Sequence, residues 1–337
     1  REGEAIAWHI VDELKPKIPV KRLVFNEITK TAILEALDKT RDIDTHLVDS
    51  QETRRFLDRL FGFMVSKTMW TNMKGGVSAG RVQSPAVKIL VDREKERTQF
   101  IQNEYWSISA EFENKNGIIN ANLIKINGNK VSTGKSFDKK SGELFNKNDV
   151  VLNDKTVKEI CNKIKDSLWK IDNVETKPSK QKPYAPFITS TLQQEGIRQF
   201  RMSAQNVMRI AQGLYENGYI TYMRTDSVHL SSEAITASRN EIKSLFGDNY
   251  LPSSAIQYSG KVKNAQEAHE AIRPAGSKFK HPDELKNKVN ADELKLYKLI
   301  WKRTLASQMK SAQIERTNLT ISNGQYIFEA KGKVVTF

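Results

Sequence analysis

The stretch Gly218-Tyr219-Ile220-Thr221-Tyr222-Met223-Arg224-Thr225-Asp226-Ser227 places a phenol, a cation and polar turn residues within a few positions. A helix is predicted just before it from apolar residues at helical spacing: Val207, Ile210, Ala211, Leu214 and Tyr215. Asn217-Gly218 is typical of a helix C-terminus. Residues 219–223 favour an extended chain, in which side chains alternate between two faces. We therefore expect Tyr222 and Arg224 to lie on the same face.

A hydroxyl and a fixed cation that point the same way suit phosphoryl transfer. A phenolic oxygen can attack phosphorus while a guanidinium offsets the charge that grows on the equatorial oxygens. The simpler interpretation of the local pattern is structural. In that interpretation Tyr219 and Tyr222 are half-buried strand tyrosines and Arg224 is a surface cation. Evidence from the rest of the chain is needed to decide between them.

Charge and cysteine content narrow the class of partner. Fifty-four Lys and Arg residues against 40 Asp and Glu give a net charge of +14, which favours a polyanion such as nucleic acid through counterion release. No apolar run is long enough for a transmembrane helix and no stretch resembles a signal peptide, so we expect no membrane partner. Cys161 is the only cysteine, which excludes an internal disulfide and fits a reducing cytoplasm.

Several blocks of the sequence resemble type IA DNA topoisomerases, most closely the bacterial enzymes. Residues 219–227 (YITYMRTDS) are similar to the active-site signature of that family. Further blocks match in the family's order: residues 1–9 (REGEAIAWH), 25–29 (FNEIT), 78–84 (SAGRVQS), 186–194 (PFITSTLQQ) and 267–274 (EAHEAIRP). The resemblance runs nearly from end to end of the chain, and ordered blocks are more specific than any single motif.

The resemblance implies an isomerase that breaks and rejoins one DNA strand. Tyr222 would attack a phosphodiester to form a 5′-phosphotyrosine, and the 3′-hydroxyl would later reverse the step. Arg224 would stabilise charge, and His269 would contact the phosphate or adjust proton transfer. The implied substrate is single-stranded or negatively supercoiled DNA. We expect a monomer in the cytoplasm, associated with the nucleoid.

The sequence bears on two cofactors, ATP and Mg²⁺. Gly128 and Gly134 are separated by five residues where a P-loop has four, so no ATP site is expected. The first residues resemble the end of the Toprim acidic motif, which holds Mg²⁺ in the family. Only Glu2 matches its acidic triad, while Glu4 lies outside it and the other ligands would precede Arg1. The resemblance thus assigns Glu2 to the catalytic and metal site, with a solvated terminal glutamate as the structural alternative. Because Arg1 falls inside a family motif, we expect an internal fragment. One carboxylate cannot make a strong Mg²⁺ site, so we expect its metal site to be incomplete and its turnover impaired.

The resemblance implies a set of residues that contact single-stranded DNA: Arg54, Arg55, Asp58, Phe63, Ser78, Arg81 and Gln83. Gln212, on the polar face of the predicted helix, is assigned to the same set. Arg54 and Asp58 are four residues apart, so an ordinary surface ion pair is the alternative for them. Phe63 would stack on a base. The helix expected after Gln83 would offer its start to a phosphate, with Ser78 or Ser84 as a possible N-cap.

The alternation of helical and strand patterns along the chain predicts a multidomain α+β protein. The resemblance implies a toroidal arrangement of its domains. We predict four regions: a Toprim remnant (1–44), a helical DNA-binding domain (45–101), a β-rich hinge domain (102–182 and 309–337) and an inserted helical domain with Tyr222 (183–308). The Toprim remnant should hold helices at 4–14 and 27–37 and a strand at 22–25. The β-rich domain should begin with a strand at 105–110 and contain Asn-Gly turns at 116–117 and 127–128.

Two other functions stay open at this point. A single-stranded DNA-binding module without catalysis would also explain the positive charge and the aromatic residues. A tyrosine recombinase would share the nucleophile but should carry a different set of Arg and His motifs. An assay for a covalent adduct between protein and DNA separates an enzyme from a binding module.

Overall fold

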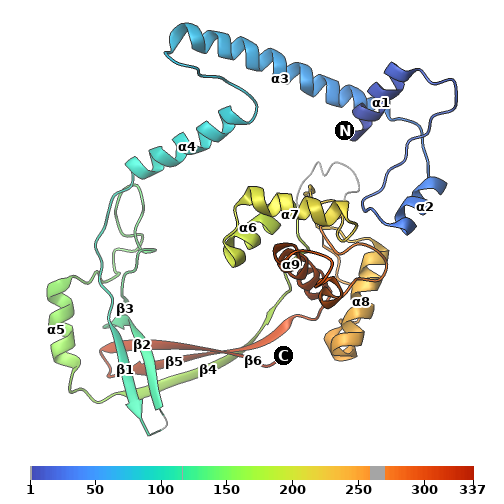
Figure 1. Cartoon of the computed structure of the whole chain (residues 1–337). Helices are drawn as coiled ribbons and strands as arrows, with labels where there is room; N and C mark the ends of the chain where they lie inside the picture. Colours follow the sequence, from blue (N-terminus) through green and yellow to red (C-terminus); the bar gives the residue numbers. More distant parts are fainter. Residues whose placement is uncertain (1, 116, 259–269) are drawn as a thin grey trace. The chain divides into compact units, whose positions relative to one another are not determined.

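The computed structural model describes residues 2–115, 117–258 and 270–337, and Figure 1 shows it as a ribbon. Helices and an antiparallel sheet together confirm the α+β class. By internal contacts the chain divides into two compact units. Unit 1 combines Arg1–Gln51 with Gln181–Ala312, and unit 2 combines Glu52–Lys180 with Gln313–Phe337. The division into four domains remains a prediction.

Unit 1 is built mainly from helices around one large core. Its elements in the described ranges are α1 (Glu2–Leu14), α2 (Lys30–Asp38), the start of α3 (Thr45–Asn72), α6 (Thr189–Phe200), α7 (Ala204–Glu216), α8 (Ser232–Phe246), α9 (Ala291–Ser307) and the 3₁₀ turns η1 (Asp248–Tyr250) and η2 (Pro282–Leu285). The predicted apolar face of α7 is buried in the core, together with Phe187, Ile220 and Ile272. Each such aliphatic or aromatic side chain contributes about 1.5–3 kcal/mol when it leaves water.

Glu4 joins α1 to the chain that follows it. Its carboxylate is buried and accepts hydrogen bonds from Arg22 Nε (3.2 Å), Arg41 Nη1 (2.9 Å) and the Asp44 N–H (2.9 Å). Burial by itself raises the pKa of Glu4, but the Asp44 N–H and the two arginines outweigh it and keep that pKa below its usual value. The predicted strand at 22–25 is wrong, because only the isolated bridge between Arg22 and Arg41 forms.

Helix α2 begins later than the sequence pattern predicted. The expected start was at residue 27, but the helix starts at Lys30, since Thr29 Oγ1 accepts the N–H of Ala32 (3.2 Å) as an N-cap. Glu27 lies outside the helix and is buried. It is therefore available for contacts with a distant part of the chain.

Unit 2 holds most of α3, then α4 (Gln83–Thr98), α5 (Asp154–Ile164) and a sheet. Its strands are β1 (Ser109–Asn114), β2 (Gly117–Ile126), β3 (Asn129–Lys130), β4 (Lys170–Gln181), β5 (Ala312–Ser322) and β6 (Tyr326–Val335), in the order β1-β2-β6-β5-β4 with β3 beside β2. β1 pairs antiparallel with β2, β2 with β6, and β5 with β6. The sheet and α5 enclose a second core that includes Leu123, Leu152 and Phe328.

Two local predictions in the sheet can be compared with the structure. The turn between β2 and β3 is formed by Asn127 and Gly128 with positive φ angles of 51° and 82°, as the Asn-Gly pair predicted. The other predicted turn includes residue 116, which lies outside the described residues. The first strand begins at Ser109 and not at residue 105, because the Trp106 N–H donates to Leu152 O (3.1 Å), outside the sheet.

The chain leaves the sheet after β4 and returns to it in β5, the neighbouring strand. The hydroxyls of Thr176 and Thr317 meet across these two strands at 2.9 Å. Helices α6 to α9 lie in the intervening part of the sequence (Figure 1). Tyr222 lies there as well, between α7 and α8. None of the helices in the described part of the chain is long and apolar enough to cross a membrane.

Candidate active site

The segment that carries Tyr222 is extended and held by a neighbouring extended segment. Ile220 forms an isolated antiparallel bridge with Pro274, and the Thr221 N–H donates to Arg273 O (2.9 Å). Thr221 Oγ1 donates to Ala271 O (2.7 Å) and accepts the Arg273 N–H (3.0 Å). Thr221 is thus bonded through both its backbone and its side chain.

Burial alternates along this segment as the sequence predicted. Thr221, Met223 and Thr225 are buried, whereas Tyr222 is half-buried and Arg224 is exposed. The nucleophile candidate and the cation therefore occupy the more accessible positions of the extended chain. This arrangement leaves both groups open to a phosphate.

Thr189, the first residue of α6, fixes the chain on either side of Arg224. Its hydroxyl donates to Met223 O (2.8 Å) and accepts the N–H of Thr225 (2.9 Å). Its own N–H donates to Thr225 O (3.0 Å). The backbone of Arg224 is consequently held from both sides, although its side chain is free to approach a ligand.

Two tyrosines of the same segment have different surroundings. The Tyr222 ring meets the Tyr215 ring edge to face, with centroids 5.3 Å apart and planes at 69°. Burial, with the nearby Tyr222, raises the pKa of Tyr215, so Tyr215 stays protonated and acts as a packing partner. The Tyr219 ring instead lies under Lys280 Nζ, 4.8 Å from the ring centroid.

Residues 26–28 pack directly against the start of the Tyr222 segment. The Tyr222 N–H donates to Asn26 O (2.9 Å). Gly218 has a φ of +70°, and a Cβ there would lie 2.5 Å from Ile28 O. Only glycine meets both demands without strain, because it tolerates positive φ and has no side chain at the close approach. The predicted helix stop at Gly218 thus also makes room for a distant segment.

Arg273 lies behind this contact, and its side chain is only 3% exposed. Its Nε and Nη2 donate to the two oxygens of Glu270 at 3.0 and 2.7 Å. Its Nη1 forms an ion pair with Glu27 Oε2 at 3.0 Å. Both oxygens of Glu27 also accept the Gly276 N–H at 3.1 Å. We call Glu27, Glu270 and Arg273 the buried cluster.

Within the buried cluster, the partners of Glu270 favour its ionised form. Burial by itself raises the pKa of Glu270, but Arg273 and the Ser231 N–H (2.7 Å) outweigh it and hold that pKa below its usual value. The cluster borders a pocket of about 340 Å³ that is also lined by residues of α2, among them Glu35 and Lys39. A charged guanidinium between two carboxylates is the arrangement that makes such burial tolerable.

The predicted DNA contacts of the first half of the chain lie in unit 2, and two of them pair with each other. Arg81 Nε donates to both oxygens of Asp58 (2.7 and 3.1 Å), with the two side chains 52% and 37% exposed. Asp58 therefore contacts Arg81. The sequence pattern had suggested only Arg54 as a partner for Asp58. Both residues line a pocket of about 560 Å³ together with Leu57 and Phe61.

Further predicted DNA contacts lie on α3 and α7. Arg54 is half-buried on α3, and Arg55 is exposed there. Phe63 is 61% exposed on the same helix, with the Arg59 guanidinium 5.8 Å from its ring centroid. Gln212 Nε2, in unit 1, donates to Glu216 Oε1 (2.8 Å) on the polar side of α7.

The approach to α4 differs from the predicted capped start. Val82 occupies the N-cap position without a side-chain hydrogen bond. Ser84 lies inside the helix, and its hydroxyl accepts the Gly80 N–H (3.1 Å), so neither Ser84 nor Ser78 is the N-cap. Gln83 Nε2 instead donates to Ser78 Oγ (3.5 Å). The side chains of this turn thus lie near the start of α4, but none of them caps it at the N-cap position.

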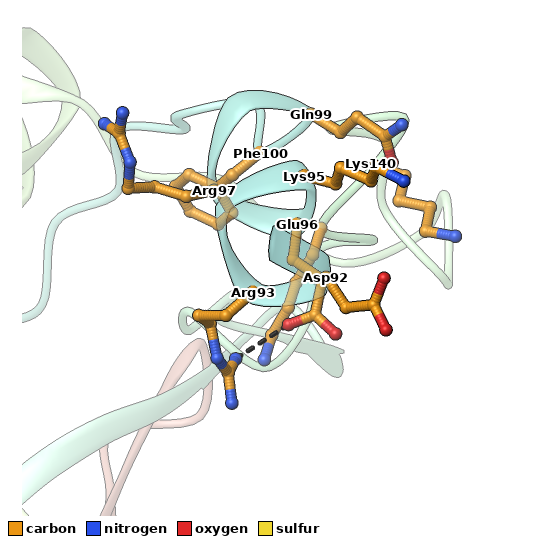
Figure 2. A pocket seen from close by; sticks show the side chains of 9 residues that line it. Asp92, Arg93, Lys95, Glu96, Arg97, Gln99, Phe100 and Lys140 are labelled. Carbon is orange, nitrogen blue, oxygen red and sulfur yellow. Dashed lines mark hydrogen bonds and ion pairs between the residues drawn. The ribbon is translucent and has the colours of Figure 1, made fainter. Parts of the chain in front are cut away.

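A pocket of about 670 Å³ lies at the other end of α4, beside the loop that contains Lys139 and Lys140. Figure 2 shows Arg93 joined to Glu96 at its edge, at 2.7 Å. Arg97 pairs with Glu94 in the same way, at 2.6 Å. These are exposed pairs three residues apart on one helix, with mixed charges typical of a solvated helix face.

Comparisons with known proteins identify the family. The sequence profile described as "DNA topoisomerase" matches residues 42–337. The chain belongs to the DNA topoisomerase family. It is similar to "DNA topoisomerase 1" of Mycolicibacterium smegmatis (47% identity over 350 residues) and of Synechocystis sp. (47% over 340 residues). In both cases all of this chain aligns, and it spans 37% of the relative's length.

A solved topoisomerase has the same fold. The structure titled full-length topoisomerase I from Thermotoga maritima superposes with a TM-score of 0.77 and 36% sequence identity. The match covers 100% of this chain and 52% of the solved one. This topoisomerase-family chain therefore shares a fold with a larger enzyme and corresponds to about half of it.

Two predicted catalytic residues of this topoisomerase-family chain, His269 and Glu2, are not placed beside Tyr222 by the described residues. His269 falls outside the described residues. Glu2 is exposed and accepts a hydrogen bond from Gln51 Nε2 (3.3 Å). Within residues 2–115, 117–258 and 270–337, no three His, Cys, Asp or Glu side chains are grouped to hold a metal. The acidic residues in these ranges do not by themselves fit a Mg²⁺ site.

Sequence reasoning did not assign roles to Glu27, Thr189 or Tyr215, although they contact the Tyr222 segment or its neighbour. Glu27 and Thr189 both lie in blocks that match the topoisomerase family, residues 25–29 and 186–194. That match was the available signal. It did not show that the two blocks converge on Tyr222, because block order carries no information on contacts.

Proposed function

We propose that this chain carries the nucleophilic part of a type IA DNA topoisomerase. Tyr222 Oη attacks a phosphorus of one DNA strand, the tyrosyl O–P bond forms, and the P–O3′ bond breaks. The phenol loses its proton and the departing 3′ oxygen takes one up, which leaves a 5′-phosphotyrosine and a 3′-hydroxyl with no net change in protons. In the reverse step the 3′-hydroxyl attacks the phosphotyrosine and restores the strand. The number of ester bonds is conserved, so the reaction needs no ATP.

The observation that carries this proposal is the placement of Tyr222 and Arg224. Both occupy accessible positions of an extended segment in which the alternate residues are buried. Of these, Thr221 is bonded to Ala271 and Arg273, and Met223 is bonded to Thr189. A nucleophile and a cation on a rigid support favour the transition state over the ground state. Arg224 offsets the charge on the phosphate oxygens. His269 is proposed as a further contact of that phosphate.

The substrate is proposed to be single-stranded or negatively supercoiled DNA. The net charge of +14 favours association with a polyanion. In unit 2, the exposed ring of Phe63 on α3 offers a stacking surface, and Arg81 offers a cation in the turn before α4. Passage of a second strand through the break would then relax the DNA.

Other features of the whole enzyme stay at the level of proposal for this chain. They are the Toprim identity of its first residues, the toroidal arrangement, a Mg²⁺ requirement, a monomeric state and a cytoplasmic location with the nucleoid.

The test is a covalent adduct with an end-labelled single-stranded oligonucleotide, trapped by denaturation and resolved on a gel. We expect an adduct with the unmodified chain, none with Tyr222→Phe, and retained adduct with the matched control Tyr219→Phe. The phenylalanine at position 222 keeps the ring contact with Tyr215 while removing the attacking oxygen. DNA affinity, measured in parallel by fluorescence anisotropy, should be unchanged in both variants.

The outcomes separate the enzyme from its rival. Full adduct yield in Tyr222→Phe would move the nucleophile elsewhere, with Tyr219 the next candidate. Tight binding without any adduct in the unmodified chain would favour a single-stranded DNA-binding module. An adduct that depends on Tyr222 supports the topoisomerase reaction.

A further inference from the structure

The buried cluster joins two parts of unit 1 that are far apart in the sequence. Residues 26–28 contribute Asn26 O and the Glu27 carboxylate, and residues 270–276 contribute Arg273 and the Gly276 N–H. The Tyr222 N–H is bonded to the first of these segments. The backbone amide of the proposed nucleophile and the Glu27 carboxylate thus both take part in the contact between these two segments.

The two carboxylates of the cluster hold Arg273 differently. Glu270 accepts two hydrogen bonds from Arg273, through Nε and Nη2, and lies only three residues from it in the same segment. Glu27 makes one contact with Arg273, through Nη1. If residues 26–28 moved away, Arg273 would keep its bidentate partner, and Nη1 would keep its bond to Pro274 O (2.8 Å).

We propose that Glu27 and Arg273 form a releasable latch that positions the backbone of Tyr222 while it is closed. In the closed state the latch holds residues 26–28 against Tyr222 and Gly276. In the open state Arg273 remains paired with Glu270, and Glu27 moves into water. This inference rests on the proposed function for its purpose, since a protein that passes one strand through another must separate contacts near its nucleophile and remake them.

The physics of the contact favours reversibility. Breaking a buried ion pair is costly when a charge is left buried without a partner. Separation of these segments avoids that outcome, because Glu27 becomes hydrated and Arg273 retains Glu270. The backbone bonds of Tyr222 and Gly276 to residues 26–27 are likewise exchanged for bonds to water. An apolar contact of the same area is not directional, so it would bring the two segments back to the same relative position less specifically.

Hydrogen–deuterium exchange resolved to single amides tests the latch without DNA. Glu27→Gln removes the charge but keeps an acceptor and the side-chain volume. We expect the Tyr222 and Gly276 amides to exchange about tenfold faster in this variant, because they depend on the Glu27 side of the contact. The Thr221 amide, which is bonded to Arg273 O within the tyrosine-bearing part, should be unchanged.

A matched control and a second variant keep the test specific. Glu35→Gln removes an exposed carboxylate from the border of the same pocket and should leave all of these amides unchanged. Glu27→Asp restores the charge on a shorter side chain and should restore part of the protection. Unchanged exchange at Tyr222 and Gly276 in Glu27→Gln would overturn the latch. Equal acceleration at Thr221 would also overturn it, because it would show general loosening.

The adduct assay connects the latch to chemistry. In Glu27→Gln we expect adduct formation at saturating oligonucleotide to slow about tenfold while the Kd for the oligonucleotide stays the same, because positioning affects the reaction step. A weaker Kd with an unchanged rate would overturn the positioning role. If the unmodified chain formed no adduct while the exchange result held, the proposed function would fail and the latch would stand.

Discussion

Arg273 and Arg81 are both paired with carboxylates, but their surroundings differ. Arg273 is 3% exposed and is held by Glu270, Glu27 and a backbone carbonyl, so its charge is used entirely within the protein. Arg81 is 52% exposed and pairs with Asp58, itself partly in water. Removing one partner of a buried pair costs about 3–5 kcal/mol because a charge is left buried without compensation, whereas an exposed pair contributes about 0–1 kcal/mol. The first arginine is suited to hold chain segments together, and the second is free to exchange its carboxylate for a phosphate.

The largest expected effect comes from removing the buried cation. Arg273→Met leaves Glu27 and Glu270 facing each other without compensation, and we expect a loss of about 3–5 kcal/mol in the free energy of unfolding. Urea-induced unfolding followed by circular dichroism measures it. The exposed counterpart Arg97→Met should cause no measurable change in the same experiment. A loss below about 1 kcal/mol for Arg273→Met would show that water already reaches the cluster.

The second effect separates packing from charge at the same interface. Gly218→Ala adds a Cβ at a φ of +70° and 2.5 Å from Ile28 O, without touching the ion pairs. We expect a cost of about 1–3 kcal/mol from backbone strain and from displacement of residues 26–28. Gly247→Ala is the control, because it has a φ of +89° but nothing within 4 Å of the added Cβ. Equal costs at both positions would assign the effect to backbone strain alone.

The third effect is a dependence of stability on pH. The pKa of Glu270 is lowered in the folded protein from its reference value of 4.5, so its contribution is present above that pH and is lost as pH falls through the folded value. The stability difference between the unmodified protein and Glu270→Gln should therefore shrink on acidification below 4.5. Urea unfolding at stepwise lower pH measures this difference. A difference that grew on acidification would contradict the sign of the shift.

The smallest effect on stability is expected at the exposed pair. Arg81→Ala should change the free energy of unfolding by no more than about 0.5 kcal/mol. It should nevertheless weaken binding to single-stranded DNA about equally for different base sequences and reduce the salt slope by about 1. Anisotropy titrations at several salt concentrations test this, with Arg97→Ala as a control on another exposed pair. A loss that depended strongly on base sequence would argue against a phosphate contact.

The sequence by itself determined the local elements and the identity of the reactive stretch. The apolar face of α7, its end at Asn217-Gly218 and the Asn127-Gly128 turn follow from side-chain periodicity and from residues that tolerate positive φ. The alternation that brings Tyr222 and Arg224 to the accessible side follows from the geometry of an extended chain. These features depend only on residues close together in the sequence.

Only the tertiary structure decided which distant groups meet. Glu27 was expected inside a helix and instead lies before α2, where it pairs with Arg273. Thr189 reaches the backbone around Arg224, and Asp58 pairs with Arg81. Periodicity indicates that a side chain is buried, but it does not indicate what lies opposite. That partner is set by how the segments pack, because burial of a charge is stable only where packing supplies a compensating group.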